Sequence, residues 1–290
     1  MTVPTGETAQ VVEVACDESG FSGTNLLDPA SPVIVHAAVD LGEADAAELL
    51  GTLRTRFHHR GTTEHKAHLL LRPGQPEAVA WFRDALDGRS TVHVVDKRGH
   101  LAARVLDLLT GTPSYLDGTP LGRDHGVSAD VLRERADVLA AFVAMTRLKH
   151  RRRVDGGAVD RFLAVVPADV PELAGLTCAG VVTVLERLLD GDPAVPPPLE
   201  PLVPALAATA LRWSDGRRSV AVVHDEQSAL TPQRTTLLAA ALAVAVAPAP
   251  PPLLGVRQVD SRRDARVQVA DLLAGLARRD ALQAAGAPRR

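Results

Sequence analysis

The sequence predicts an α/β fold interrupted by a helical insertion, and three observations support this prediction. Short runs rich in β-branched residues alternate with longer segments whose apolar residues recur at helical spacing. In the middle of the chain, helical segments are separated by glycine- and proline-containing loops, with no strand-like run of comparable quality. The strand pattern then resumes towards the end, and 290 residues suffice for one large domain with an insertion.

The composition is that of a globular protein and excludes several other classes. Hydrophobic residues make up 46% and charged residues 23%, which argues against wholesale disorder. A net charge of −3 argues against a globally basic, histone-like binder but is compatible with a local basic groove. The two cysteines, Cys16 and Cys178, are too few for a disulfide framework or a four-thiolate zinc site, so we expect buried thiols.

Neither a leader nor a membrane span is expected. Met1 to Gln10 has no basic segment followed by an apolar one, so a cytoplasmic protein is the default expectation. Leu237 to Val256 carries no charge, but prolines break it and leave a helical part shorter than the roughly 20 residues a bilayer requires. These prolines are Pro248, Pro250, Pro251 and Pro252.

The first region is expected to contain three strands and two helices. Val11 to Asp17 reads VVEVACD and ends before the turn formers Ser19 and Gly20, which is typical of a strand leaving a sheet. The other strands are expected at Val33 to Val39 and Thr91 to Val95, and the helices at Gly42 to His59 and Gln75 to Asp87.

The middle region is expected to be helical. A proline-rich stretch, Pro193 to Pro204, predicts a stiff surface connector at its end. The expected helices are Leu101 to Leu109, Ser128 to His150, Ala158 to Val165 and Thr177 to Leu189.

The last region returns to the α/β pattern. We expect strands at Ser219 to Val223 and Leu253 to Val259, and helices at Pro232 to Ala247 and Asp264 to Arg279. This order divides the chain into a discontinuous core (11–100 and 217–280), a helical insertion or cap (101–216) and a flexible tail (281–290).

Acidic residues follow three of the predicted strands. Asp17 and Glu18 end the first strand, Asp225 and Glu226 end the fourth, and Asp260 follows the fifth. Open α/β sheets bind ligands at the carboxyl ends of their strands. Each acid alone could be a solvated turn residue, but three together favour a site. Strand alternation also places Glu13 on the same face as Asp17.

The closing helix adds a fourth acid, Asp271, within the apolar segment VQVADLLAGLA. At helical spacing, Asp264, Gln268, Asp271 and Gly275 form one stripe. Gly275 would allow another backbone or a ligand to approach that stripe closely. A polar stripe facing water, with Arg266 or Arg278 nearby, would explain this helix equally well on its own.

Carboxylates gathered from separate elements predict a divalent cation. They raise one another's pKa unless cations or basic side chains neutralise them. Oxygen ligands favour Mg²⁺ or Mn²⁺, and two such ions about 4 Å apart can support hydrolysis of a phosphodiester without a nucleophilic side chain.

Four short motifs, in this order and spacing, resemble a known family. They are DESG at 17–20, EHK at 64–66, HDEQS at 224–228, and VDS followed by QVADLLAG between 259 and 275. Together they resemble the bacterial and phage family catalogued as domain of unknown function 3800, which is similar to the ribonuclease H-like superfamily. The resemblance covers residues 11 to about 280 and implies a ribonuclease H-like mixed sheet flanked by helices.

This resemblance also implies a set of metal ligands, although the family lacks an established activity. Carried over by position, the acids are Asp17, Glu64, Asp225 and Asp271. The Asp260-Ser261 pair is an added feature of the family, and Asp260 could replace one of these ligands.

Other groups of residues give weaker indications of a functional site. His58, His59, His65 and His68 surround Glu64, but no H-E-x-x-H spacing supports a zinc site. P-loop, dinucleotide-binding and α/β-hydrolase motifs do not occur, and Ser19 and Ser22 lack the context of a catalytic triad.

Two basic groups could contact an anionic polymer. The KHRRR segment at 149–153 is explained by the dipole of the helix that it is expected to end. Arginines beside the C-terminal acids can hold phosphate oxygens, which predicts weakly sequence-specific contacts with DNA or RNA. These arginines are Arg257, Arg262, Arg263 and Arg266.

The sequence therefore predicts a Mg²⁺- or Mn²⁺-dependent nuclease with two ions. Asp17, Asp225 and Asp271 are the main ligands, with Glu64 and Asp260 secondary; Lys66 and Arg262 contact phosphate, while Gln268 and Ser261 orient the site. Two alternatives remain: a non-catalytic module with a structural or vestigial cation site, whose insertion binds a protein partner, or a metal phosphohydrolase acting on small phosphorylated substrates.

Overall fold

The structure is a computed structural model that describes residues 10–21, 23, 25–57, 67–70, 75–148 and 151–286. Glu64 and Lys66 lie outside the described residues, as do three of the histidines considered for zinc and the side chain of the fourth. These histidines are His58, His59, His65 and His68.

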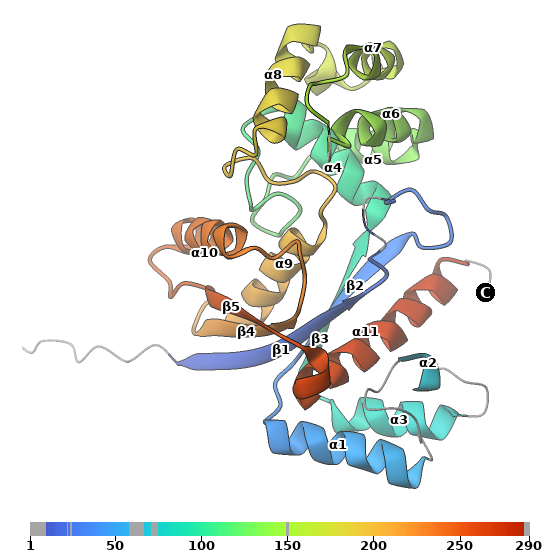
Figure 1. Ribbon diagram of the computed structural model, residues 1–290, viewed down its shortest axis with the longest axis vertical. Helices are drawn as coiled ribbons and strands as arrows, with labels where there is room; N and C mark the ends of the chain where they lie inside the picture. The colour runs from blue at the N-terminus through green and yellow to red at the C-terminus, as the bar shows by residue number, and fades with distance from the viewer. Residues whose placement is uncertain are drawn as a thin grey trace, which may run out of the picture.

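A five-stranded mixed sheet forms the centre of the molecule, which confirms the α/β prediction (Figure 1). Its order is β3-β2-β1-β4-β5, with β2 antiparallel to β1 and β3, and β1, β4 and β5 parallel. The strands are β1 (Val11–Ser19), β2 (Val33–Val39), β3 (Ser90–Asp96), β4 (Ser219–Asp225) and β5 (Leu253–Val259).

The strand register brings the acidic strand ends to one edge of the sheet. Cys16 pairs with His224, so Asp17 and Asp225 leave neighbouring parallel strands side by side. Asp225 in turn pairs with Val259, which precedes Asp260. The expectation that these three strand ends share an edge is met.

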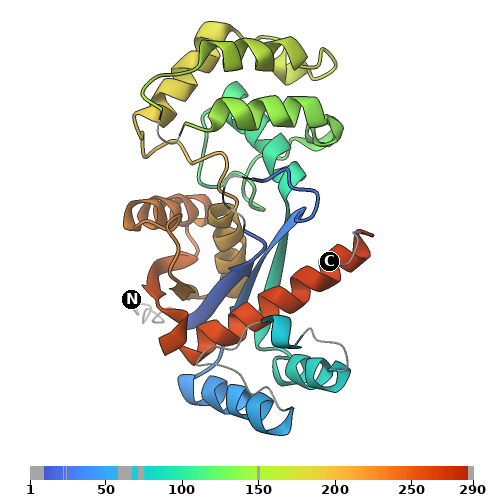
Figure 2. The ribbon, with the colours of Figure 1, turned by 45° about the vertical axis from the view of Figure 1, so that its right-hand side comes forward.

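One face of the sheet is covered by the long C-terminal helix α11 (Ala265–Ala284), which crosses β1 and β2 (Figure 2). Ala15 and Val223 of the sheet share a core with Leu272 of this helix. A Cβ at Gly275 would lie 2.1 Å from the Cβ of Ala67, so this glycine permits the expected close approach of another segment. Outside α11 lie α1 (Glu43–Arg56), α2 (Ala67–Leu70) and α3 (Pro76–Ala85).

The other face is covered by α9 (Leu202–Ser214) and α10 (Pro232–Val246). Val14, Cys16 and Val222 contribute to this second core. The sequence predicted a connector up to Pro204 and no helix after it, which is wrong for α9. Its segment LVPALAATALRWS is buried on almost every side, so it has no polar stripe from which helical spacing could be read.

The remaining helices form a separate lobe with its own apolar core, which we call the cap. Leu106, Phe142 and Leu185 are buried there. The cap consists of α4 (Lys97–Thr110), α5 (Gly126–Glu134), α6 (Ala136–Thr146), α7 (Gly156–Val165), the 3₁₀ turn η1 (Pro171–Leu173) and α8 (Cys178–Leu189).

Two local expectations about the cap are wrong. The single helix expected from Ser128 to His150 is divided at Arg135, whose ψ of 83° is not helical. The guanidinium of Arg98 donates to the Arg133 carbonyl at 2.8 and 2.5 Å, and so satisfies a group at the end of α5. Cys178 is exposed at the start of α8, whereas Cys16 is buried as expected.

Among the helices in the described part of the chain, none combines the length and the apolar character needed to cross a bilayer.

Candidate functional site

Three of the predicted acids meet at the carboxyl edge of the sheet. Asp17 is only 7% exposed, and this burial is the main reason why its pKa is raised to about 9. The charges of Asp271 and Asp225 act in the same direction. The strand register and these charge effects place the three carboxyl groups in one region at this edge of the sheet, near enough for their charges to act on one another.

Glu18 joins this group, although the sequence did not single it out. Its side chain is 7% exposed, and its backbone N–H donates to Asp17 Oδ1 at 2.7 Å. Gln227 donates from Nε2 to Glu18 Oε1. Burial is the main cause that raises the pKa of Glu18 to about 7, and the charge of Asp225 adds to it. We call Asp17, Glu18, Asp225 and Asp271 the acidic cluster.

Asp225 is held by the segment that follows β5. The backbone N–H of Ser261 donates to Asp225 Oδ1 at 3.0 Å. Gln268 of α11 donates from Nε2 to the Ser261 carbonyl at 2.9 Å. Gln268 and Ser261 therefore connect α11, the β5 exit and a predicted ligand in one hydrogen-bonded series.

Asp260 and Arg262 pair with each other instead. Asp260 accepts the backbone N–H of Arg262 at 3.0 Å and its Nη2 at 2.7 Å. The hydrogen bond from the Arg262 side chain is the main cause that lowers the pKa of Asp260 to about 2. Asp260 is not among the groups that shift the pKa of Asp17, so its role as a ligand stays a prediction.

Arg266 binds two further acids, Asp264 of the expected helix stripe and Glu13 of β1. This guanidinium donates to Asp264 at 3.0 and 2.7 Å and to Glu13 at 2.7 Å. Glu13 thus shares a face with Asp17, as strand alternation indicated, but its partner is an arginine. Because Arg266 is only 8% exposed, the expectation that it contacts phosphate is not supported.

A buried histidine pair lies on the other face of the sheet, next to Glu18. His36 Nδ1 is 2.8 Å from Thr209 Oγ1, and His36 Nε2 is 3.2 Å from His224 Nε2. His224 Nδ1 is 2.9 Å from the Asp225 carbonyl. Burial lowers the pKa of both histidines, so both are neutral near pH 7.

Glu200, which precedes α9, extends the acidic region from a further element. Burial raises its pKa to about 7, and the charge of Glu18 adds to this effect. Its Oε1 accepts the backbone N–H of Leu202 at 3.2 Å. Sequence reasoning missed Glu200 because it lies within the proline-rich stretch that was interpreted as a surface connector.

The acidic cluster gathers several carboxyl oxygens. Among the described residues, no group of three or more His, Cys, Asp or Glu side chains is arranged to hold a metal ion. The pKa values of Asp17 and Glu18 are both raised, so these carboxyl groups hold a proton more readily than exposed acids do. These oxygen donors have the chemistry that Mg²⁺ and Mn²⁺ prefer.

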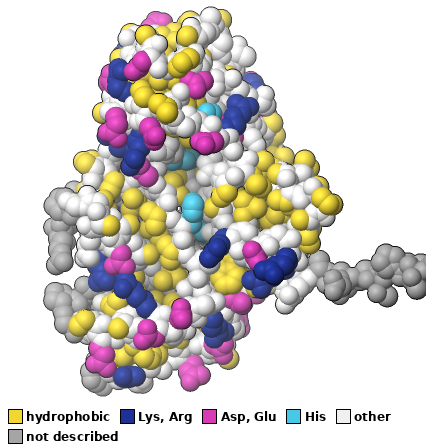
Figure 3. Space-filling view, turned by 180° about the vertical axis from the view of Figure 1, so that it is seen from behind, with side chains coloured by type: hydrophobic (Ala, Val, Ile, Leu, Met, Phe, Trp, Pro, Cys, Tyr) yellow, Lys and Arg dark blue, Asp and Glu magenta, His cyan; other side chains and the backbone are white. Residues whose placement is uncertain are grey.

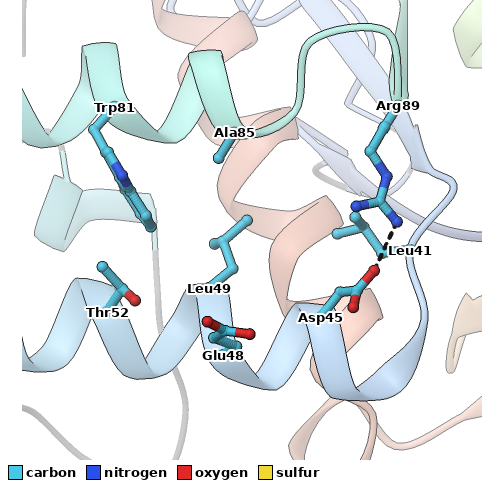
Figure 4. A pocket seen from close by; sticks show the side chains of 8 residues that line it. All are labelled: Leu41, Asp45, Glu48, Leu49, Thr52, Trp81, Ala85 and Arg89. Atoms are coloured by element: carbon cyan, nitrogen blue, oxygen red, sulfur yellow. Dashed lines mark hydrogen bonds and ion pairs between the residues drawn. The ribbon is translucent and has the colours of Figure 1, made fainter.

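An open groove of about 320 Å³ lies away from the acidic cluster, between α1 and α3 (Figure 4). Trp81 and Leu49 supply its apolar wall, and an Asp45–Arg89 ion pair of 2.8 Å closes one end. None of the predicted site residues that the structure describes lines this groove.

The back of the molecule carries no uniform basic stripe (Figure 3). Lysine and arginine side chains there alternate with acids and surround a band of hydrophobic side chains. A polyanion therefore finds no continuous positive track on this face.

No protein-family model, curated protein or solved structure matches the chain.

Proposed function

We propose that this protein is a divalent-metal-dependent nuclease built on a ribonuclease H-like fold. The observation that carries the proposal is that the charges of Asp225 and Asp271, which are partly exposed, act on buried Asp17, so acids from two strand ends and the final helix lie in one region. The sheet order, with antiparallel β2 between β1 and β3, is in line with the resemblance on which the fold was expected.

The chemistry of the cluster favours a hard cation. Burial of carboxyl groups without a cation is costly, and the raised pKa values of Asp17 and Glu18 reflect that cost. Mg²⁺ or Mn²⁺ would supply a Lewis acid that polarises a phosphoryl oxygen and lowers the pKa of a water molecule. Asp17, Asp225 and Asp271 are the residues that would hold the two ions. Glu64 stays a predicted further ligand.

The protein's own groups supply orientation. Gln268 fixes the Ser261 backbone, and Ser261 fixes one carboxylate oxygen of Asp225. This leaves Asp225 Oδ2 in a set direction, since one oxygen is already bonded. Such positioning reduces the rearrangement that must accompany ligation.

Nucleic acid is the proposed substrate because exposed arginines border the same edge of the sheet. The side chains of Arg257 and Arg262 are 57% and 66% exposed. An arginine bound to phosphate oxygens reads no base through that contact, so such contacts predict weak sequence specificity for DNA or RNA. Lys66 stays a further predicted phosphate contact.

The strongest alternative is a non-catalytic module whose helical cap binds a protein partner. The finding that favours it is that the described residues include no group of three or more potential ligands arranged to hold a metal ion. A metal phosphohydrolase acting on small phosphorylated substrates would share the acidic cluster and differ in substrate.

Calorimetric titration of Mn²⁺ tests the proposal without a choice of substrate. The wild type should bind Mn²⁺ and then cleave DNA or RNA oligonucleotides, whereas a variant with Asp17→Asn and Asp271→Asn should do neither. A matched control neutralises the exposed acids Asp45 and Glu48 of the α1–α3 groove and should retain both properties. Absence of Mn²⁺ binding by the wild type, with oligonucleotide present, would favour the interaction module.

A further inference from the structure

We propose that two copies of this chain associate through their β3 strands, which pair antiparallel with Val92 of one copy opposite Val94 of the other. The two sheets then join into one continuous sheet across a two-fold axis. The open edge of β3, its two exposed valines and the self-complementary sequence of the strand support this assembly. The assembly does not depend on the proposed function.

β3 is the last strand on its side of the sheet, where it pairs only with β2. The backbone N–H of Lys97 donates to the Pro32 carbonyl at 3.0 Å. Because hydrogen bonding alternates along an antiparallel strand, the odd-numbered residues of β3 direct their backbone groups to β2, whereas Val92 and Val94 direct theirs outward. Within the described part of the chain, no other segment pairs with the N–H and C=O groups of these two valines.

The side chains at these two positions are apolar and exposed. Val92 is 41% and Val94 46% exposed. Their partners on β2, Ala37 and Val35, are fully buried in the core beneath α11. The cover that α11 gives to this face of the sheet is therefore nearly complete at β2 and only partial at β3. Exposed valines beside outward backbone groups can accept a further strand.

The opposite edge strand, β5, has protection that β3 lacks. Its pairing with β4 is irregular between Val220 and Ala221. Gly255 and the exposed Arg257 lie within it. Bulges and charges of this kind discourage pairing with another chain. β3 reads STVHVVD, without proline, lysine or arginine, and pairs with β2 at seven successive residues. β3 is therefore the edge at which a further strand fits.

A second copy of the chain is the partner that the sequence of β3 favours. With Val92 opposite Val94 of the other copy, each exposed valine faces a valine, and the outward N–H and C=O groups of both residues find partners across the axis. A shift by two residues would place Val94 opposite Ser90, or Val92 opposite the carboxylate of Asp96. Apolar cross-strand pairs stabilise a sheet, so the first register is preferred.

His93 lies on the two-fold axis in this register. It faces its own copy as a non-hydrogen-bonded pair, with Cα atoms about 4.5 Å apart. Burial lowers the pKa of His93, so the imidazole is neutral near pH 7 and the two copies do not repel each other. Residue 93 faces its own copy in this register alone, which makes the register measurable.

Sedimentation equilibrium of single variants tests the assembly. The wild type should form a dimer at micromolar concentration. Val94→Lys should weaken the dimer at least ~10-fold, because the two-fold axis removes both valine pairs at once and places a charge in each. Leu254→Lys, at a 51% exposed position of β5, is the matched control and should dimerise like the wild type. Equal dimerisation of the two variants would overturn the proposal. A monomeric wild type would also overturn it and leave the edge of β3 to an extended segment of another protein.

Disulfide cross-linking tests the register and remains informative if Val94→Lys fails to fold. The background is Cys178→Ser, which removes the exposed native thiol. His93→Cys should form a linked dimer under mild oxidation, since Cα atoms about 4.5 Å apart are within reach of a disulfide. Val92→Cys is the control, because its two copies lie on a diagonal about 7 to 8 Å apart and should link poorly. Linkage no greater in His93→Cys than in Val92→Cys would overturn the proposal.

Discussion

The backbone N–H of Ser261 donates to Oδ1 of Asp225 at 3.0 Å, which ties the residue after β5 to the last residue of β4. Asp225 thus has one oxygen committed to the scaffold and one free to act. Its direction depends on η2 (Ser261–Arg263), and through Gln268 on α11. Both elements therefore help to position Asp225, a predicted ligand, although Ser261 and Gln268 are not themselves predicted to bind the metal.

Gln268→Leu should weaken the site without removing a ligand. The substitution deprives the Ser261 carbonyl of its donor, which costs about 1 to 3 kcal/mol in the free energy of unfolding. Mn²⁺ affinity should fall by roughly 10- to 100-fold, as is usual when a group that orients a ligand is lost. Calorimetry and urea unfolding measure the two effects. Gln283→Leu, at an exposed position of α11, serves as control, and equal Mn²⁺ affinity in both variants would contradict the orienting role.

Asp17→Asn should make the metal-free protein more stable at alkaline pH. The pKa of Asp17 is about 9 in the folded state and roughly 3.9 in an unfolded chain. The folded state therefore holds the proton over this range, and the wild type loses stability as pH rises from about 4 to about 9. Asparagine is neutral over this pH range. Its side-chain oxygen can still accept the hydrogen bond from the Glu18 N–H, which is 2.7 Å long with Asp17.

The measurement is the difference in unfolding free energy between Asp17→Asn and the wild type in EDTA. It should grow with pH and reach about 2 to 4 kcal/mol at neutral pH. The variant must be compared with the wild type because burial also lowers the pKa of His36 and His224. These two histidines make both proteins more stable as pH rises, which is opposite to the effect of Asp17. A variant less stable than the wild type across the whole pH range would refute this prediction.

Thr209→Val should destabilise the histidine pair specifically. Valine matches the shape of threonine but removes the hydroxyl that donates to His36 Nδ1 at 2.8 Å. A buried acceptor without a donor costs about 1 to 3 kcal/mol. The ¹⁵N chemical shift of His36 Nδ1 should change in Thr209→Val and stay close to the wild-type value in Thr209→Ser, which keeps the hydroxyl. Unchanged shifts in both variants would show that the hydroxyl does not set the tautomer.

Arg266→Lys should cost stability and leave phosphate contacts unaffected. Asp264 is 4% exposed and is bonded by two nitrogens of the Arg266 guanidinium, a geometry that lysine cannot reproduce. We expect a loss of about 2 to 4 kcal/mol in urea unfolding. Arg263→Lys, at an exposed position in η2, should be close to neutral. A lower affinity for oligonucleotides at unchanged stability would instead assign Arg266 to the substrate.

The strands could be predicted because their side chains are distinctive. Val33–Val39 and Leu253–Val259 have the bounds that the sequence indicated, since β-branched runs between turn formers have few other interpretations. The helix α9 was missed because burial on all sides removes the amphipathic pattern. The division at Arg135 depends on the distant Arg98, which no local pattern contains.

The acidic cluster was predicted only in part, because strand ends and helix spacing can be read from the sequence but contacts between distant elements cannot. Asp17, Asp225 and Asp271 follow from strand ends and helix spacing. Glu18 was named only as part of the first strand end and was not chosen as a ligand; in the structure its side chain is 7% exposed, and burial and the charge of Asp225 raise its pKa. The contributions of His36 and Thr209 depend on contacts between β2 and α9, which the sequence does not reveal.

The position of β1 has a consequence for synthesis of the chain. Val11 pairs with Ser219, so the central strand is made first and receives its second neighbour 208 residues later, the difference between these two numbers. At typical translation rates this interval is roughly 10 to 40 s. During that time β1 and β2 can form a hairpin whose free edge is open to other chains. We therefore expect the nascent chain to be prone to aggregation until β4 emerges, so expression at reduced temperature with added chaperone should raise the soluble yield.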